Sequence, residues 1–153
     1  MPMFLSTYTN KVDKKGRVSV PARYRAILAG ESFNGVILFP SFVGPAIEAC
    51  GMAFMERLQA DLGEFDPFSE AHDDLALAIM SDSHELSWDS EGRILLPPVL
   101  LAHAGISDAA TFVGAGERFQ IWQPAAAEAR KRETRARAQK HRGLLRRRPE
   151  TPS

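Results

Sequence analysis

The sequence has very little cysteine: Cys50 is the only one in 153 residues. No disulfide can form within the chain, which is typical of proteins kept in a reducing compartment. No apolar run approaches the eighteen or so residues of a membrane span, and the first residues lack the basic and apolar regions of a secretory signal. Hydrophobic residues make up 44% of the chain, which is enough for a core. These features predict a soluble, cytoplasmic protein.

The sequence also lacks recognisable catalytic chemistry. It has no nucleophile elbow, phosphate loop or dinucleotide fingerprint. None of the four histidines has a second His, Cys or carboxylate at a spacing typical of zinc sites. They are His72, His84, His103 and His141. The sequence therefore predicts no catalytic residue, metal, cofactor or small-molecule substrate, and a protein that is not an enzyme.

The net charge of zero hides a strong asymmetry along the chain. Residues 1–129 contain 9 Lys and Arg against 17 Asp and Glu, whereas residues 130–153 contain 10 against 2. An acidic body thus carries a basic tail. This pattern indicates either a polyanionic partner or interaction arm, or a solvated, frayed terminus.

The first clear pattern runs from Tyr8 to Pro21. Val12, Val18 and Val20 share one parity, as a half-buried strand pair requires. Between these strands, the aspartate in Asp13-Lys14-Lys15-Gly16 can open a turn and the glycine can adopt positive φ. Pro21 fits the first turn of a helix over residues 22–28, ended by Gly30. Residues 35–40 then predict a short buried strand.

The same pattern returns 76 residues later. Asp89 to Pro97 matches Asp13 to Pro21 at four of nine positions, namely Asp, Gly, Arg and Pro. Each copy continues into a short helix ended by a glycine and then into an aromatic-bearing strand that meets a proline. The matched helices are 22–28 and 98–103, and the matched strands are 37–40 and 119–124. We infer an internal duplication of a strand–turn–strand–helix–strand unit.

The remaining segments predict helices. Apolar residues recur at three- and four-residue spacing over 45–63, and a second helix is expected over 70–80. Residues 125–142 are rich in helix formers but have no apolar stripe, and Gly143 and Pro149 would end that helix. The predicted organisation is a first repeat (3–43), a helical connection (44–82), a second repeat (83–124) and a basic tail, helical and then disordered (125–153).

The two Gly-Arg turns are the candidate site. The first places Lys14, Lys15 and Arg17 within four residues, and arginine can bind a guanine edge or a phosphate in a bidentate way. The second keeps Arg93 but gains Glu91. The alternative interpretation is an ordinary turn with solvated charges. The candidate DNA-binding residues are Lys14, Lys15, Arg17 and Arg93, and the candidate turn-shaping residues are Asp13, Gly16, Asp89 and Gly92.

Residues 13–21, Asp-x-Lys-Gly-Arg-Val-Ser-Val-Pro, followed by Arg23-Tyr24-Arg25, resemble the AbrB/SpoVT class of DNA-binding modules. Two such modules in one chain resemble the MraZ family of bacterial regulators over about residues 3–130. The resemblance implies a mixed β/α fold, a pseudo-symmetric swapped-hairpin β-barrel built from two tandem repeats with flanking helices. It also implies ring assembly and binding to repeated boxes upstream of the cell-division and cell-wall gene cluster.

The resemblance assigns the DNA contacts to Lys15, Arg17 and Arg93, and Lys14 is added on charge alone. The resulting prediction is a nucleoid-associated, homo-oligomeric regulator whose partner is double-stranded DNA, with no membrane partner. Phe39 and Ile121-Trp122 are expected to cover apolar surface between subunits. Two alternatives stay open: an antitoxin-type module whose partner is a toxin protein, and a structural ring protein that binds no DNA.

Overall fold

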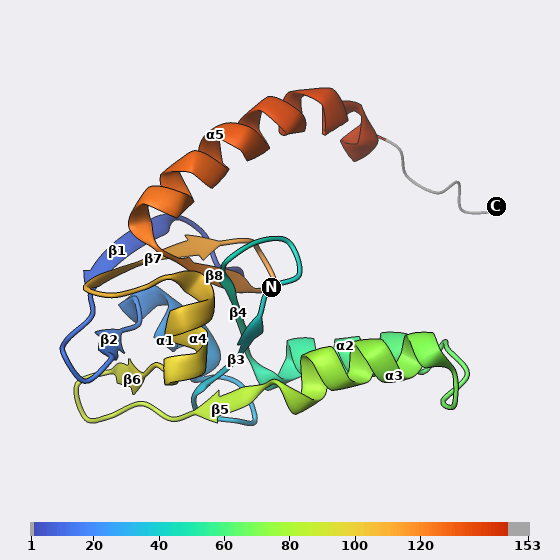
Figure 1. Cartoon of the computed structure of the whole chain (residues 1–153), viewed down its shortest axis with the longest axis horizontal. Coiled ribbons are helices and arrows are strands. Elements are labelled where there is room, and N and C mark those ends of the chain that lie inside the picture. The colour runs from blue at the N-terminus through green and yellow to red at the C-terminus, as the bar shows by residue number, and fades with distance from the viewer. Residues whose placement is uncertain (1, 147–153) are drawn as a thin grey trace.

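Strands from the two sequence repeats pair across the repeats in the computed structural model, which describes residues 2–146 (Figure 1). The strands are β1 (Thr7–Lys11), β2 (Arg17–Ser19), β3 (Val36–Pro40), β4 (Ile47–Cys50), β5 (His84–Leu86), β6 (Arg93–Leu95), β7 (Ala109–Gly114) and β8 (Phe119–Trp122). The α-helices are α1 (Ala22–Leu28), α2 (Met52–Leu62), α3 (Glu70–Ala76), α4 (Pro98–Ala104) and α5 (Pro124–His141). The predicted mixed β/α class is confirmed.

Six strands form one antiparallel sheet in the order β1-β7-β8-β4-β3-β5, and β2 pairs with β6 in a separate two-stranded ribbon. The opening strand of each repeat pairs with a later strand of the other repeat, β1 with β7 and β5 with β3. Because β4 pairs with β8 at the centre, the strand order is unchanged when equivalent strands are exchanged. Within residues 2–146 these pairings give an open sheet and a ribbon, without the closed barrel that the resemblance implied.

The strand pair expected inside the first motif is much shorter than the sequence suggested. Only the Val12–Val18 bridge joins its two strands. Beyond that bridge, β1 pairs with β7 and β2 pairs with β6. The parity of the valines reflects burial in a shared core, since Val12, Val18 and Val20 are all buried.

The main core lies between the ribbon, helices α1 and α4, and one face of the sheet. Val18 and Ile94 enter it from the ribbon, and Leu28 and Leu100 enter it from the two short helices. The other face of β3 and β4 contributes Ile37, Phe39 and Cys50 to a second cluster beneath α2 and the π-helical segment Leu77–Ser81. The central strands are therefore buried on both faces.

The helix predicted over residues 45–63 is wrong in its first part. Ile47–Cys50 forms β4, and α2 begins only at Met52, after Gly51 in an extended conformation. All four β4 residues are buried between β3 and β8. A helix here would leave one edge of β3 and one edge of β8 without a hydrogen-bonding partner, so tertiary pairing overrides the apolar spacing.

The match between the third segments of the repeats is also corrected. Each repeat closes with a hairpin, β3–β4 in the first and β7–β8 in the second. The counterpart of β3 is therefore β7, and β8 corresponds to β4. An aromatic residue before a proline indicated the wrong partner, because it marks the end of a strand without saying which strand of the hairpin ends there.

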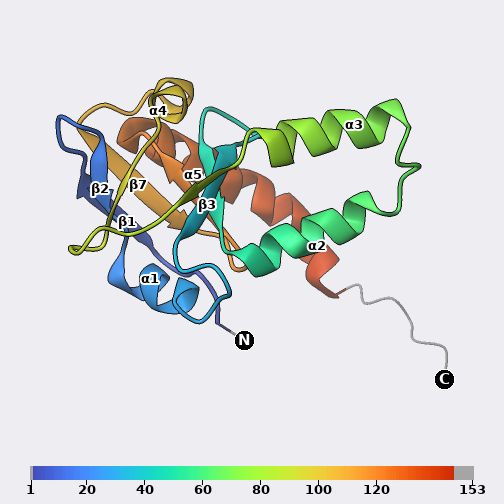
Figure 2. The same ribbon diagram turned by 90° about the horizontal axis from the view of Figure 1, so that it is seen from below.

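The remaining helix predictions are confirmed. Helices α1, α4 and α3 form as expected, and Gly105 ends α4 with a left-handed φ of 63°. Helix α5 forms over almost the predicted range and ends at His141, two residues before Gly143. Pro149 and the end of the tail lie outside the described residues. In both views, α2 and α3 form an arm that projects away from the body on the side opposite the β2–β6 ribbon (Figures 1 and 2).

The apolar residues expected between subunits lie inside the chain. Phe39, Ile121 and Trp122 are buried in the core clusters. Met55 of α2 and Ile79 pack with Phe39, Ala46 and Ala127 pack with Trp122, and Ile121 lies in the main core. None of the three side chains is therefore free to make a subunit contact.

Candidate nucleic-acid interface

A single aspartate organises the first basic turn. One carboxylate oxygen of Asp13, Oδ1, accepts hydrogen bonds from the backbone amides of Lys15 (3.0 Å) and Arg17 (2.9 Å). The other oxygen, Oδ2, accepts the Arg17 Nε–H at 2.7 Å. The backbone closes as well, because the Gly16 amide donates to the Asp13 carbonyl at 3.0 Å. Gly16 has a φ of 91°, a conformation that L side chains rarely adopt.

The second turn has the same construction. Asp89 Oδ1 accepts the amides of Glu91 (2.8 Å) and Arg93 (2.9 Å), and Oδ2 accepts the Arg93 Nε–H at 2.8 Å. The Gly92 amide donates to the Asp89 carbonyl, and Gly92 has a φ of 76°. The duplicated motif therefore folds into the same local structure twice.

These hydrogen bonds stabilise the ionised aspartates. The Arg17 backbone amide, more than any other group, lowers the pKa of Asp13 below its ordinary value, and the Arg93 amide does the same for Asp89. In turn, the hydrogen bond to Asp89 raises the pKa of Arg93. Both turns are thus charged at neutral pH.

The β2–β6 ribbon places both arginines on one face. Its antiparallel register pairs Arg17 with Leu95 and Ser19 with Arg93. The middle residues, Val18 and Ile94, are buried, so these four alternate residues face outward. Arg17 and Arg93 lie at opposite ends of the ribbon, about 7 Å apart along it from the rise per residue. A two-stranded ribbon of this kind is narrow enough to enter the major groove of DNA.

The two turns differ in charge although they share a backbone. Lys14 and Lys15 are exposed beside Arg17, whose side chain is 36% exposed. At the second turn, Glu91 binds a terminal nitrogen of Arg93 at 2.9 Å, and the Arg93 side chain is 29% exposed. Each arginine is held to its own turn by an aspartate.

Sequence reasoning missed the placement of Arg25 at the second turn. Its Nε donates to the Val20 carbonyl at 3.1 Å. Its guanidinium packs directly over Gly92, so that a Cβ added to Gly92 would lie only 2.5 Å from the central guanidinium carbon, Cζ. The residue 76 positions later, Leu101, lies against Gly16 in the same way. The 76-residue offset was the available signal in the sequence, because it makes Arg25 and Leu101 equivalent positions of the two repeats. The cation of this pair lies at the second turn, which lacks the lysines of the first.

Other features of the chain do not form a reaction site. Within residues 2–146, no group of three His, Cys, Asp or Glu side chains is close enough to hold a metal ion. Cys50 is buried in the core, and burial raises the pKa of its thiol to about 12. No helix in that part of the chain is long and apolar enough to cross a membrane.

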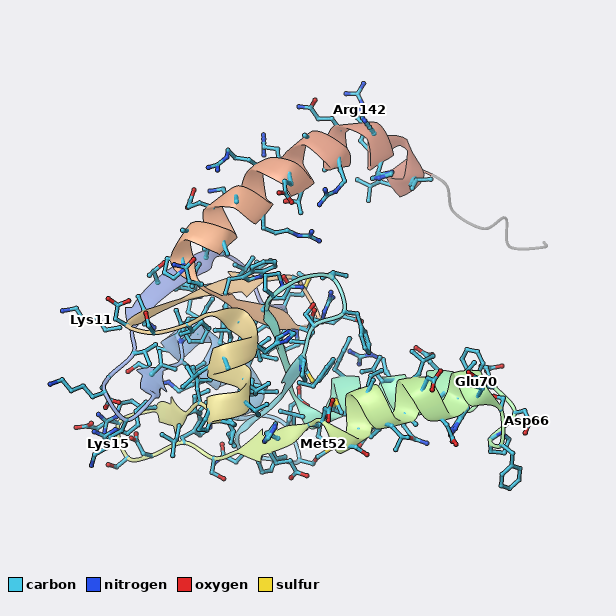
Figure 3. The ribbon with its side chains drawn as sticks, in the orientation of Figure 1. Lys11, Lys15, Met52, Asp66, Glu70 and Arg142 are labelled. Atoms are coloured by element: carbon cyan, nitrogen blue, oxygen red, sulfur yellow. The ribbon has the colours of Figure 1, made fainter. Side chains whose placement is uncertain are left out.

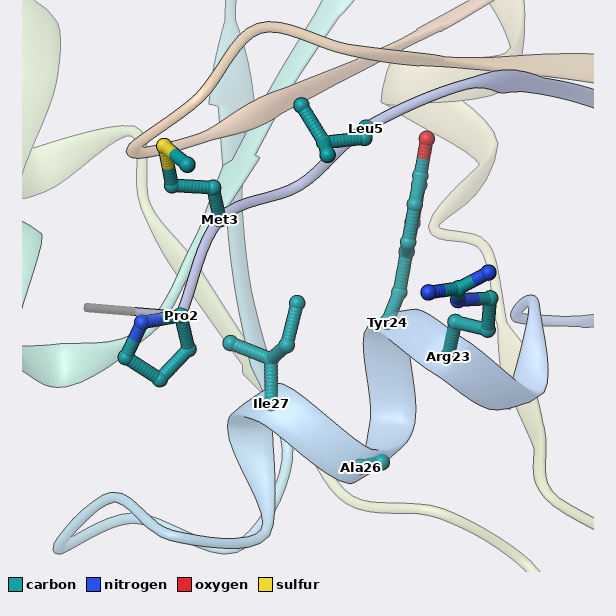
Figure 4. Close-up of a pocket in the computed structure, with 7 residues that line it drawn as sticks. All are labelled: Pro2, Met3, Leu5, Arg23, Tyr24, Ala26 and Ile27. Atoms are coloured by element: carbon teal, nitrogen blue, oxygen red, sulfur yellow. The ribbon is translucent and has the colours of Figure 1, made fainter.

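An apolar groove of about 370 Å³ opens between the N-terminal segment and α1 (Figure 4). Met3 and Leu5 line one side of it and Ile27 lines the other, with Arg23 at its edge. None of its lining residues belongs to either turn, and the lining is suited to apolar contact.

The sequence matches known proteins over most of its length. The family model described as "MraZ protein, putative antitoxin-like" matches residues 3–40 and 79–147. A transcriptional regulator MraZ from Pelagibacter ubique is 50% identical over 143 residues, which cover 94% of this chain and 92% of that protein. One from Rickettsia canadensis is 52% identical over 124 residues, covering 81% and 83% respectively.

The doubled turn on a mixed β/α scaffold, together with these relatives, defines a two-repeat transcriptional regulator. The chain belongs to the MraZ family. This membership confirms the family resemblance noted in the motifs and the prediction that the protein is a regulator and not an enzyme.

Proposed function

We propose that this regulator binds specific DNA sequences with the outer face of the β2–β6 ribbon and its two turns. The observation that carries the proposal is the repetition of one arginine-bearing turn whose register sets both arginines on the same exposed face. Lys14 and Lys15 attract phosphate, and Arg17 reads a base edge.

The aspartate contact prepares Arg17 for this role. Asp13 holds Nε and so fixes the plane of the guanidinium, while both terminal nitrogens remain available for the two acceptors of a guanine edge. Arg93 has one terminal nitrogen bound by Glu91 and makes the weaker contact. Arg25, packed over Gly92, restores positive charge at that end.

We further propose that the two repeats are related by a pseudo-twofold axis in a swapped-hairpin arrangement. The exchange of strands between repeats supports this: β1 pairs with β7, β5 with β3, and β2 with β6. The symmetry would present the two turns to DNA in related orientations.

The subunits assemble into a homo-oligomeric ring in this proposal. A body with a net charge of −8 over residues 1–129 binds DNA best when several basic turns act together. The groove of Figure 4 supplies uncovered apolar surface, and Phe68, 93% exposed at the tip of the α2–α3 arm, supplies an apolar side chain that would enter it on a second copy. The groove and the arm tip are different surfaces, so this contact would run head to tail, as in a ring.

Family membership extends the proposal to the biological target. The expected sites are repeated short boxes upstream of the cell-division and cell-wall gene cluster, and the expected location is the cytoplasm, at the nucleoid. An antitoxin-type role or a structural ring, with a protein as the main partner, is the alternative. The words "antitoxin-like" in the family description favour keeping it.

Titration of the full chain with DNA from upstream of its own gene, and with a scrambled duplex, at two salt concentrations tests the proposal. We expect tighter binding to the native sequence, with the preference retained as salt rises. Equal binding to both duplexes would contradict specific recognition. No binding to either, with a stable oligomer, would favour the structural ring.

A further inference from the structure

Helix α5 is attached to the body only at its beginning. Ala127 is buried against Trp122 and Ala46, and the Arg130 guanidinium lies 5.9 Å from the centre of the Trp122 ring. From Lys131 to Leu145 every residue is exposed. The helix therefore leaves the sheet after about two turns and projects into solvent (Figure 1).

The projecting part is strongly cationic. Residues 130–142 contain seven Lys and Arg and one acidic residue, Glu133. Six of the seven are exposed, and none of those six is paired with a carboxylate in the part of the chain that the structure describes. They are Lys131, Arg132, Arg135, Arg137, Lys140 and Arg142. At about 1.5 Å per residue, they extend along some 17 Å of helix.

The composition of this segment points to a polyanion and away from a protein groove. Between Ala127 and His141 the only apolar side chains are alanines, and the cations are distributed around the whole helix. A helix that docks on a protein needs an apolar stripe to bury. A helix that neutralises phosphates needs only exposed charge.

The cationic end of α5 lies away from the proposed DNA-reading turns. Lys15 and Arg142 lie at opposite ends of the molecule (Figure 3). The end that holds Arg142 also carries the α2–α3 arm (Figure 3). This arm is acidic, because residues 52–76 contain seven Asp and Glu and one Arg. The charge of α5 is thus separate from that of the turns.

We propose that α5 is a second nucleic-acid-binding surface, which binds the phosphate backbone of duplex DNA without regard to sequence. The proposal shares its ligand with the function proposed for the turns, but it rests on different residues. It gives the chain one surface for specific reading and another for general attraction to DNA. The acidic arm of a second copy is the competing occupant of α5, and the missing apolar stripe argues against it.

The test is the salt dependence of binding by the full chain. A variant with Arg132→Gln, Arg135→Gln, Arg137→Gln and Lys140→Gln removes four charges and keeps good helix formers. On a scrambled duplex, we expect the slope of log K against log salt to fall in magnitude by about 3 to 4. The ratio of specific to scrambled affinity should stay as in the parent. Arg57→Gln, an exposed arginine on α2, is the matched control and should leave the slope unchanged.

An unchanged slope in the four-site variant would overturn the proposal. An unchanged slope with a smaller particle in light scattering would overturn it in favour of contact with the acidic arm of a second copy. The turns are tested separately by Arg17→Ala. A smaller salt slope in the α5 variant, together with unchanged sequence specificity in Arg17→Ala, would support DNA binding by α5 and contradict the role of the turns. An unchanged salt slope in the α5 variant, together with reduced specificity in Arg17→Ala, would contradict DNA binding by α5 alone.

Discussion

The aspartates of the two turns each perform two tasks. One carboxylate oxygen of Asp13 fixes the backbone of the turn and the other fixes the Arg17 side chain. Asp89 repeats this with Arg93. A side chain oriented before binding loses less conformational freedom when it meets its ligand. The turn and the arginine therefore act as one unit.

Arg17→Ala is expected to weaken specific DNA binding by about 1–3 kcal/mol per engaged site and to relax sequence preference. Arg93→Ala should have a smaller effect, because Glu91 already occupies one of its nitrogens. The affinities of each variant for the native and the scrambled duplex measure the loss of binding and the change in sequence preference. Since each arginine also binds its own turn, melting and particle size must be compared with those of the parent, and Arg57→Ala is the control.

Lys14→Ala is expected to act differently, because Lys14 is exposed and the proposed interface assigns it to phosphate and to no base. Binding should weaken equally on all sequences, and the salt slope should fall by about one. A change in sequence preference would show instead that Lys14 reads a base.

The lowered pKa of the turn aspartates predicts a specific acid sensitivity. A carboxyl group whose pKa is depressed on folding stabilises the fold at pH values above its unfolded pKa of about 3.9. That contribution is lost as the pH falls through the lower folded value. The variant with Asp13→Asn and Asp89→Asn should melt lower than the parent at pH 7, and its melting temperature should decline less between pH 5 and pH 3. Parallel melting curves for the two proteins would contradict this.

At the residue scale, the sequence contained the turns but not their surroundings. Asp, Gly and Arg at fixed spacing sufficed to predict both turns, because local hydrogen bonds make them. The position of Arg25 over Gly92 depends on how α1 packs against the other repeat. No local pattern encodes that contact, and only the 76-residue offset hinted at it.

At the scale of elements, the sequence predicted helices better than strand partners. Helices α1, α3, α4 and α5 follow from local caps and propensities. The β4 strand was assigned to a helix, and β3 was matched with β8, because both depend on neighbours distant in the sequence. The duplication was visible in the residues themselves, whereas a swapped arrangement of its copies was expected only from the family resemblance.

Buried polar contacts around Glu48 hold the β3–β4 hairpin to β8. Glu48 accepts hydrogen bonds from the Ser41 hydroxyl (2.7 Å) and from Arg118 Nε (2.9 Å). Glu48→Ala should lower the free energy of unfolding by about 1–3 kcal/mol, since both donors lose their acceptor. Glu117→Ala, at an exposed carboxylate that lies 3.5 Å from Arg57, is the control and should change stability little. Equal effects in denaturant titrations would contradict this role.

At the scale of the whole molecule, positive charge is concentrated in the turns and α5, on a body whose net charge over residues 1–129 is −8. Such a body repels DNA except where the basic surfaces face it. The arrangement favours one orientation of the protein on DNA, and a ring would multiply it.

The proposed ring makes an assembly prediction. Light scattering at micromolar concentration should give a mass several times that of the 16.9 kDa chain. Phe68→Ser and Leu5→Ser should each reduce that mass, because they remove apolar surface from the two sides of the proposed contact. Leu144→Ser, at an exposed leucine outside that contact, is the matched control. A monomeric parent would contradict the ring, and unchanged assembly in both variants would contradict this contact.

Chemical footprinting of lysines and arginines, read by mass spectrometry with and without the upstream duplex, tests the central claim most directly. It should be done at a salt concentration that weakens non-specific binding. We predict protection of Lys14, Lys15 and Arg17, weaker protection of Arg93, and none of Arg57. Bound DNA that leaves Lys14, Lys15 and Arg17 as reactive as in the free protein would contradict the account.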